Sequence, residues 1–241
     1  MTTNVLLCGY GQMGRMLHSL IDDAPDLAVA KIIDVDNVAD LESDPKADVV
    51  IDFSGPGIFP VLSGYVQRTG TALVSGSTGY ADHGQALKDL GQYAPVIYTE
   101  NYSVGVNVMA QVTAELSRLL GDEFDVELVE THHHFKKDAP SGTAQLLLRA
   151  VDPDGERPLV YGRNPSDGPR QPGEIGVHSL RGGTVPGDHT VGFYGDDETV
   201  TLSHRASSRR IFAQGALTMA RRLVGKPAGS YTFNELLASA E

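Results

Sequence analysis

The chain has 241 residues, of which 41% are hydrophobic and 21% charged, so it is long enough for one large or two modest domains with proper cores. It carries 19 Lys and Arg against 31 Asp and Glu, and the formal net charge of -12 argues against general binding to nucleic acid or to an anionic membrane surface. An anionic ligand then needs local positive charge, and the obvious suppliers are Arg205, Arg209, Arg210, Lys136 and Lys137.

The single cysteine, Cys8, lies in an apolar run and has no second cysteine to pair with. An internal disulfide and a cysteine-based zinc site are therefore excluded, and a reducing compartment is the natural one. No early segment has the pattern of a secretory signal, and no apolar run approaches the ~20 residues that span a bilayer. We expect a cytoplasmic protein with neither a membrane nor a nucleic-acid partner.

A glycine-rich turn follows the first strand pattern. Residues 4–8 read as a short buried strand, and residues 15–21 have helical spacing. Between them, three glycines of a G-x-G-x-x-G string allow a tight turn, close approach of a pyrophosphate to backbone amides, and packing of the helix on the strand. The residues of this turn that we expect to contact a dinucleotide are Gly9, Gly11, Gln12, Met13 and Gly14.

An acidic residue strengthens this interpretation. The second predicted strand, residues 28–33, ends in Asp34, about twenty residues after Gly14, where an acid can accept hydrogen bonds from the adenosine ribose hydroxyls. The same carboxylate would repel a 2′-phosphate, so NADH is expected to be preferred over NADPH. The alternative is that Asp34 is a solvated strand end and that the glycines serve packing only.

The rest of the first half of the chain alternates between strand patterns and helix patterns. Strands are predicted at 48–53, 72–75 and 95–99, and helices at 58–67 and 81–90, which indicates a parallel sheet covered on both faces. Ligands of such sheets bind in loops beyond the carboxyl ends of the strands. In those loops we expect cofactor contacts from Phe53, Ser54, Gly76, Ser77, Thr78, Asn101 and Tyr102. For the Gly76 turn, an ordinary polar turn is nearly as good an explanation.

The second half has a different pattern. A long helix is predicted at 107–120 and a strand at 124–131, and the three histidines that leave this strand end cannot all point the same way. After a helix that begins past Thr143 come a Gly/Pro-rich passage at 152–173, strands at 176–181, 188–194 and 198–205, and an amphipathic helix at 212–223. This order predicts a second domain of the mixed α+β kind.

Residues 130–143 combine titratable side chains with an anion-binding turn. Pro140 fixes a backbone angle, Gly142 permits close approach, and a helix follows directly, so backbone amides at its start would bind a carboxylate. Exposed histidines beside lysines are often only a solvated loop, and consecutive residues rarely form a metal site, so no metal is expected. The Asp-Ala-Pro-Ser-Gly-Thr continuation is what favours a functional site.

In these blocks the sequence resembles the dihydrodipicolinate reductase family, now called 4-hydroxy-tetrahydrodipicolinate reductases. The blocks run in family order from end to end, and the most specific is Glu130-x-His-His-x-x-Lys-x-Asp-Ala-Pro-Ser-Gly-Thr143. The others are 9–14, 76–79, 101–106, 187–190, 205–209 and 212–215. The resemblance implies a Rossmann-like α/β cofactor domain, 1–103 plus 213–241, and a substrate-binding and tetramerisation domain, 104–212, whose sheet builds a homotetramer.

The resemblance also implies an activity and roles for particular residues. It implies NAD(P)H-dependent conversion of (4S)-4-hydroxy-2,3,4,5-tetrahydrodipicolinate, with loss of water, to 2,3,4,5-tetrahydrodipicolinate in diaminopimelate and lysine biosynthesis. His132 and Lys136 occupy the catalytic positions, whereas His134, Phe135 and Lys137 fall at variable ones. The residues at substrate-binding positions are His133, Lys136, Ser141, Gly142 and Thr143. Hydride delivery to a conjugated ring leaves a carbanion to be protonated, which needs a general acid such as His or Lys beside a bound dicarboxylate.

Two other functions remain open at this point. The cofactor half would look much the same in another two-domain dehydrogenase acting on a semialdehyde or an amino acid, although the His-His-x-x-Lys block argues against that. A dinucleotide sensor that binds NADH without turnover would tolerate loss of Lys136, whereas an enzyme would not. For Arg205, Arg209 and Arg210, a solvated helix start is as good an explanation as a role in the site.

Overall fold

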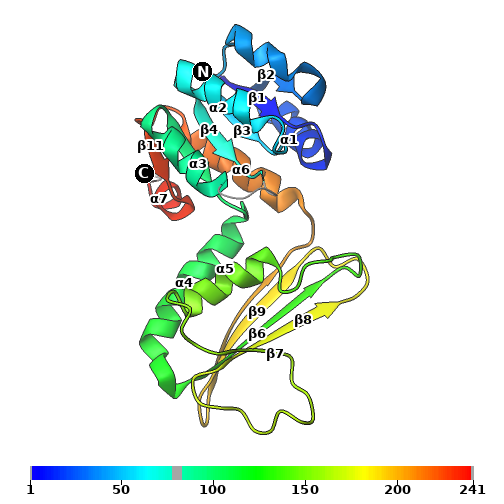
Figure 1. The fold of residues 1–241 in the computed structure, drawn as a ribbon, viewed down its shortest axis with the longest axis vertical. Coiled ribbons are helices and arrows are strands. Elements are labelled where there is room, and N and C mark those ends of the chain that lie inside the picture. Colours follow the sequence, from blue (N-terminus) through cyan, green and yellow to red (C-terminus); the bar gives the residue numbers. More distant parts are fainter. Residues whose placement is uncertain (1, 78–82, 240–241) are drawn as a thin grey trace. The chain divides into compact units, whose positions relative to one another are not determined.

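The computed structural model describes residues 2–77 and 83–239, and the chain divides into two compact units. The first unit is formed by Met1–Ser103 together with Arg210–Glu241, and the second by Val104–Arg209. The chain returns to the first unit at Arg210, where a helix begins. Each unit has its own sheet and its own core (Figure 1).

The first unit is an α/β layer structure around a parallel sheet. Its strands lie in the order β11-β5-β4-β3-β1-β2, and every pairing is parallel. The strands are β1 (Thr3–Cys8), β2 (Leu27–Ile33), β3 (Val49–Asp52), β4 (Ala72–Ser75), β5 (Pro95–Tyr98) and β11 (Gly229–Tyr231). The helices are α1 (Gln12–Asp22), η1 (Val35–Ser43), α2 (Phe59–Thr69), α3 (His83–Asp89), η2 (Leu90–Gln92), α6 (Arg210–Leu223) and α7 (Phe233–Ala238). This is the Rossmann-like fold that the alternating sequence pattern predicts.

Continuous apolar runs explain why these strands are central. Strands β3 and β4 are buried at every position, as expected for strands covered on both faces. Helix α6 contacts β3, β4 and β5 with a face that includes Ala213, Ala216 and Met219, all fully buried. Helix α6 therefore helps to cover a sheet whose strands β1 to β5 come from the start of the chain.

The second unit packs two helices on a mixed sheet of order β10-β9-β6-β8-β7 (Figure 1). Strand β6 pairs antiparallel with β9 and parallel with β8. The elements are α4 (Val104–Leu120), η3 (Gly121–Glu123), β6 (Asp125–His132), α5 (Gly142–Val151), β7 (Leu159–Tyr161), β8 (Ile175–Arg181), β9 (Asp188–Tyr194) and β10 (Thr199–Arg205). The mixed α+β class predicted for this half is confirmed, and alternate residues of β6 enter the core.

The structure adds short elements that the sequence pattern did not indicate, among them β7, β11, α7 and the 3-10 helices η1 and η3. Strand β7 lies inside the Gly/Pro-rich passage, and β11 and α7 follow α6. All are short, and three residues are too few to show a period. Among the residues that the structure describes, no helix is long and apolar enough to cross a membrane.

Candidate active site

The glycine turn between β1 and α1 has the geometry of a phosphate-binding loop. Gly9 adopts a φ of +88°, and a Cβ there would lie 2.7 Å from the carbonyl oxygen of Phe53. A Cβ on Gly14 would overlap the carbonyl oxygen of Gly9, so these two glycines are required by packing. Gly11 differs, because a Cβ there meets nothing within 4 Å and the residue is exposed at the N-cap of α1 without a side-chain cap. Backbone and helix start are open to an anion at Gly11, and the residues fit a dinucleotide.

Asp34 directly follows β2 and begins η1. Its carboxylate accepts a hydrogen bond from the backbone N–H of Val35 at 2.9 Å, and its own N–H donates to Asn37 Oδ1 at 2.7 Å. The residue is half-buried, and a carboxylate has about four lone-pair sites. Capping of η1 therefore leaves acceptor capacity for ribose hydroxyls.

A buried carboxylate organises the loops beyond β3 and β4. Asp52 is 1% exposed and accepts hydrogen bonds from the hydroxyls of Ser54 at 2.5 Å, Ser75 at 2.8 Å and Ser77 at 2.8 Å. The Ser77 hydroxyl predicted to contact the cofactor is thus committed to Asp52. Thr78, the neighbouring candidate, lies outside the described residues.

Phe53 and Tyr102 pack against each other beside these loops. Their rings meet edge to face with centroids 5.7 Å apart, and a Cβ on Gly76 would overlap the Phe53 ring. Tyr102 is 1% exposed and its hydroxyl donates to the carbonyl oxygen of Ser75 at 2.8 Å, so its side chain supports the loop from inside. Asn101 Oδ1 accepts from the N–H of Ser103 at 2.8 Å.

The histidine run leaves β6 as the sequence predicts, with three different environments. His132, the last residue of β6, is 7% exposed, His133 is half-buried, and His134 is exposed beside Phe135. The Nδ1 atom of His133 is buried and has no hydrogen-bond partner among the described residues. Such an atom is commonly satisfied by a ligand or water.

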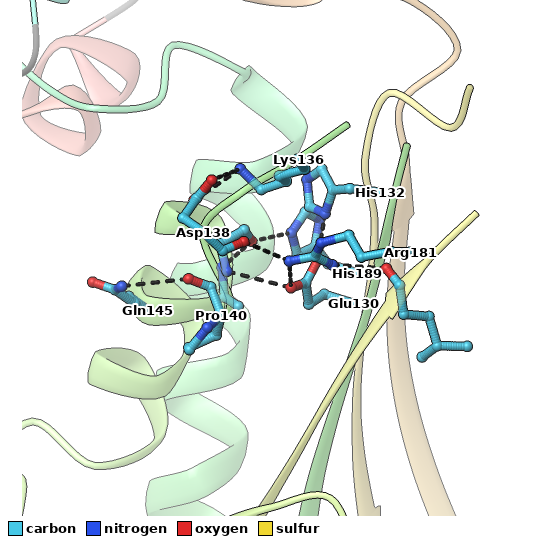
Figure 2. A network of polar contacts seen from close by, with 11 residues as sticks. Glu130, His132, Lys136, Asp138, Pro140, Gln145, Arg181 and His189 are labelled. Atoms are coloured by element: carbon cyan, nitrogen blue, oxygen red, sulfur yellow. Dashed lines mark hydrogen bonds and ion pairs between the residues drawn. The ribbon is translucent and has the colours of Figure 1, made fainter. Parts of the chain in front are cut away.

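Lys136 closes the turn that follows. Its Nζ donates to both carboxylate oxygens of Asp138 at 2.9 Å, and only 19% of its side chain is exposed (Figure 2). This bond with Lys136 lowers the pKa of Asp138 from its ordinary value. The ammonium group of Lys136 is therefore placed to bind a carboxylate, and in this structure the carboxylate of Asp138 is bound to it.

Helix α5 begins where the Pro-Ser-Gly-Thr segment predicts. Ser141 is the N-cap and its hydroxyl accepts from the N–H of Ala144 at 3.1 Å, while Gly142 and Thr143 form the first helical positions. The N-terminus of this helix favours a negative charge. Lys136 and the start of α5 thus provide two kinds of anion contact in the same unit.

Three functional candidates, Glu130, Arg181 and His189, are residues to which the sequence analysis assigned no role. Glu130 on β6 is fully buried and accepts hydrogen bonds from Arg181 Nη2 of β8 at 2.9 Å and from the N–H of Ser141 at 3.3 Å (Figure 2). It also accepts one from His132 Nδ1. His189 of β9 lies 3.0 Å from the Ser141 hydroxyl through Nε2 and meets the ring of His132 at 5.1 Å. The family blocks contain Glu130 and His189, which was the available signal.

Burial and charge set the protonation of this cluster. Burial alone would raise the pKa of Glu130, but hydrogen bonds from Arg181, Ser179 and His132 outweigh it and lower the pKa. Burial lowers the pKa of His132, although Glu130 opposes the shift. Burial and the neighbouring His132 lower the pKa of His189 to about 4. At neutral pH the carboxylate is ionised and both imidazoles are neutral.

One atom each of Glu130, His132 and His189 lie within 4.8 Å of one another, a spacing that could hold a metal ion. The arginine on Glu130 disfavours a second cation there, because like charges repel at this distance. We therefore read the group as a hydrogen-bond network.

The three arginines that the sequence analysis named as possible anion-binding residues are distributed over both units. Arg205 ends β10 with its side chain 84% exposed and pairs with Asp188 at 3.1 Å. Arg210 begins α6 and lies 3.9 Å from Asp23. Arg209 immediately precedes this helix.

A parallel-sheet domain with a phosphate-binding glycine turn, joined to a mixed-sheet domain that carries cationic and titratable groups, defines the class of two-domain nicotinamide-dependent oxidoreductases. Family models for the N-terminus and the C-terminus of dihydrodipicolinate reductase match residues 3–102 and 105–237. A 4-hydroxy-tetrahydrodipicolinate reductase from Exiguobacterium sibiricum is 40% identical over 237 residues, covering 95% of this chain and 94% of that protein. The chain belongs to the dihydrodipicolinate reductase family.

Solved structures agree on the fold. A dipicolinate-bound dihydrodipicolinate reductase from Paenisporosarcina sp. TG-14 has a TM-score of 0.75 at 21% identity and covers 96% of this chain and 98% of that one. GenD2 from gentamicin A biosynthesis, in complex with NAD, has a TM-score of 0.60 at 14% identity and covers 98% of this chain and 90% of that one. The fold of this chain is therefore that of these two proteins.

Proposed function

We propose that this protein reduces (4S)-4-hydroxy-2,3,4,5-tetrahydrodipicolinate to 2,3,4,5-tetrahydrodipicolinate, with loss of water and with NADH or NADPH as hydride donor, in diaminopimelate and lysine biosynthesis. The observation that carries this proposal is the end-to-end similarity to named reductases, combined with the cationic and titratable groups at Lys136, His132 and the start of α5. A dinucleotide sensor without catalytic activity would need no such cationic and titratable groups in its second domain.

Lys136 and the start of α5 bind the two carboxylates in this proposal. The Nζ of Lys136 exchanges Asp138 for one carboxylate of the substrate, and the start of α5 at Gly142 and Thr143 receives the other. The N–H of Ser141 stays with Glu130. His133 Nδ1, buried without a partner among the described residues, gains one on binding. The bound cofactor supplies the hydride, and these residues hold the ring in place to receive it.

His132 supplies the proton that completes the reduction. It is neutral in the free protein because burial lowers its pKa, so it must take up a proton when substrate binds. A dianion beside the ring favours the imidazolium and raises the pKa again. His132 is therefore protonated, and able to donate a proton, only when the dicarboxylate is bound.

The decisive test is oxidation of NADH and NADPH by the purified protein, with substrate generated in place from pyruvate and aspartate semialdehyde by the preceding synthase. We expect oxidation that depends on the synthase and a loss of about 100-fold or more in kcat for Lys136→Ala, with the circular dichroism spectrum unchanged. Lys137→Ala, an exposed neighbour, is the matched control. NADH binding without oxidation would support a dinucleotide sensor instead.

A preference for NADH rests on Asp34. Its carboxylate would repel a 2′-phosphate, and the structure leaves it with acceptor capacity at the end of β2. Asp34→Asn should therefore raise the kcat/KM ratio of NADPH to NADH by about tenfold, whereas Asp36→Asn on the exposed surface should not. An unchanged ratio would show that another group sets the preference.

A homotetramer built through the sheet of the second unit is the assembly we propose, and the cytoplasm is the compartment. Helices α4 and α5 cover one side of this sheet, and partly exposed apolar side chains remain on its strands at Tyr161, Leu180 and Tyr194. Light scattering after gel filtration gives the mass directly. A monomer at micromolar concentration would contradict the assembly.

A further inference from the structure

Glu130 is the most completely enclosed charged side chain of the second unit's cluster. Its relative exposure is 0%, yet hydrogen bonds from Arg181, the N–H of Ser141 and His132 reach its two oxygens (Figure 2). A buried carboxylate with an arginine on one oxygen is stable as an anion. An ionised carboxylate can only accept hydrogen bonds, so His132 must donate from Nδ1.

We propose that Glu130 is the positioning residue of the reaction: it locks His132 in the tautomer that carries hydrogen on Nδ1, so that the exchangeable proton is taken up and released at Nε2. Arg181 assists by keeping Glu130 ionised. This inference rests on the proposed function, because it assumes that His132 donates the proton.

The surroundings of Nε2 support this direction. Gly187 lies beside that atom, and a Cβ on this residue would lie 2.9 Å from it, so the absence of a side chain keeps the atom uncovered. The ring of His189 also meets His132 edge to face. His189 remains neutral because its pKa is about 4, and it is held at Nε2 by the Ser141 hydroxyl. The uncharged His189 ring therefore packs against His132 and does not compete with it for the exchangeable proton.

The charged and titratable groups that act on His132 come from every neighbouring element. Glu130 on the same strand raises the pKa of His132, whereas Arg181 on β8 and Lys136 in the following turn lower it. His189 on β9 is the remaining titratable neighbour. Loss of the Glu130 charge alone should therefore move the titration of His132 to lower pH.

The test combines histidine NMR with kinetics. In wild-type protein labelled with ¹⁵N-histidine, and with the His132 signals assigned through His132→Asn, we expect the Nδ1–H tautomer at neutral pH. In Glu130→Gln the tautomers should mix and kcat should fall about tenfold or more, with KM values within about threefold. The fall of kcat on the alkaline side should move to lower pH, because protonated His132 is the active form. Glu130→Asp should recover part of the loss.

Controls and outcomes separate positioning from mere support. Strand β6 carries a second pair, Glu127 with His178 Nε2 at 2.7 Å, so Glu127→Gln should alter the His178 signals and leave those of His132 unchanged. A wild-type Nε2–H tautomer would overturn the proposal without any variant, even if Glu130→Gln failed to fold. So would an unmoved alkaline limb in Glu130→Gln. If wild-type protein has the predicted tautomer but oxidises no cofactor, the proposed function fails and the tautomer assignment stands.

Discussion

Asp52 in the first unit and Glu130 in the second are both buried carboxylates at or near the end of a strand, but they are satisfied in different ways. In the first unit, Asp52 ends β3 and accepts from the hydroxyls of Ser54, Ser75 and Ser77, none of which titrates. In the second, Glu130 accepts from an arginine, a histidine and a backbone amide. Neutral donors fix a loop at any ordinary pH, whereas ionisable donors couple the geometry to protonation. The contrast matches the two roles proposed above, a cofactor-binding loop that keeps its shape and a site that transfers a proton.

The glycine turn between β1 and α1 extends this contrast, because its shape requires residues without a side chain. Gly14→Ala should lower the free energy of unfolding by about 3 kcal/mol or more, since its Cβ would overlap the backbone of Gly9. Gly11→Ala, with nothing within 4 Å of the new atom, should cost about 1 kcal/mol or less and weaken NADH binding about tenfold. Urea unfolding and NADH fluorescence give both quantities. Unchanged NADH affinity in Gly11→Ala would mean that Gly11 has no part in cofactor binding and that packing explains Gly9 and Gly14 alone.

Asp52→Asn tests the neutral network. The new amide directs two N–H donors toward hydroxyls that were themselves donating, so we expect a loss of about 2 kcal/mol in the free energy of unfolding, equal at pH 6 and pH 8. Asp48→Asn is the control, because Asp48 is exposed and accepts only from Asn4 among the described residues. A loss that varied with pH over this range would break the contrast with Glu130.

His189→Gln tests the ionisable side of the comparison. The pKa of His189 in the folded protein is about 4, below its ordinary value of 6.5, so the unfolded chain binds the proton first as the pH falls. Its contribution to stability is complete above pH 6.5 and is lost as the pH falls toward 4. Wild type should lose on the order of 2 kcal/mol more than His189→Gln between pH 7 and pH 5. Exposed His134→Gln is the matched control, and equal losses in all three proteins would refute the assignment.

The structural features that could be predicted from the sequence are those that a short stretch of chain determines. The strand, glycine turn and helix at the start, and the helix that follows the Pro-Ser-Gly-Thr segment, depend on neighbours in sequence and were predicted correctly. Arg181 and His189 could not be placed that way. Their positions follow from the register that pairs His132 with Arg181 in parallel and Glu130 with His189 antiparallel, across some fifty residues. Such a register depends on the packing of the whole sheet.

The smallest expected effect concerns Asp138, which occupies Lys136 in the free protein. The pair is exposed on the Asp138 side, so Asp138→Asn should change the free energy of unfolding by less than about 1 kcal/mol. Because Lys136 no longer exchanges one carboxylate for another, the substrate KM should fall roughly threefold with kcat unchanged, while Asp122→Asn on the exposed surface has no effect. A rise in KM would instead mean that Asp138 holds the ammonium group in position for the substrate. Either result separates competition from orientation at the one cation that the proposed mechanism cannot lose.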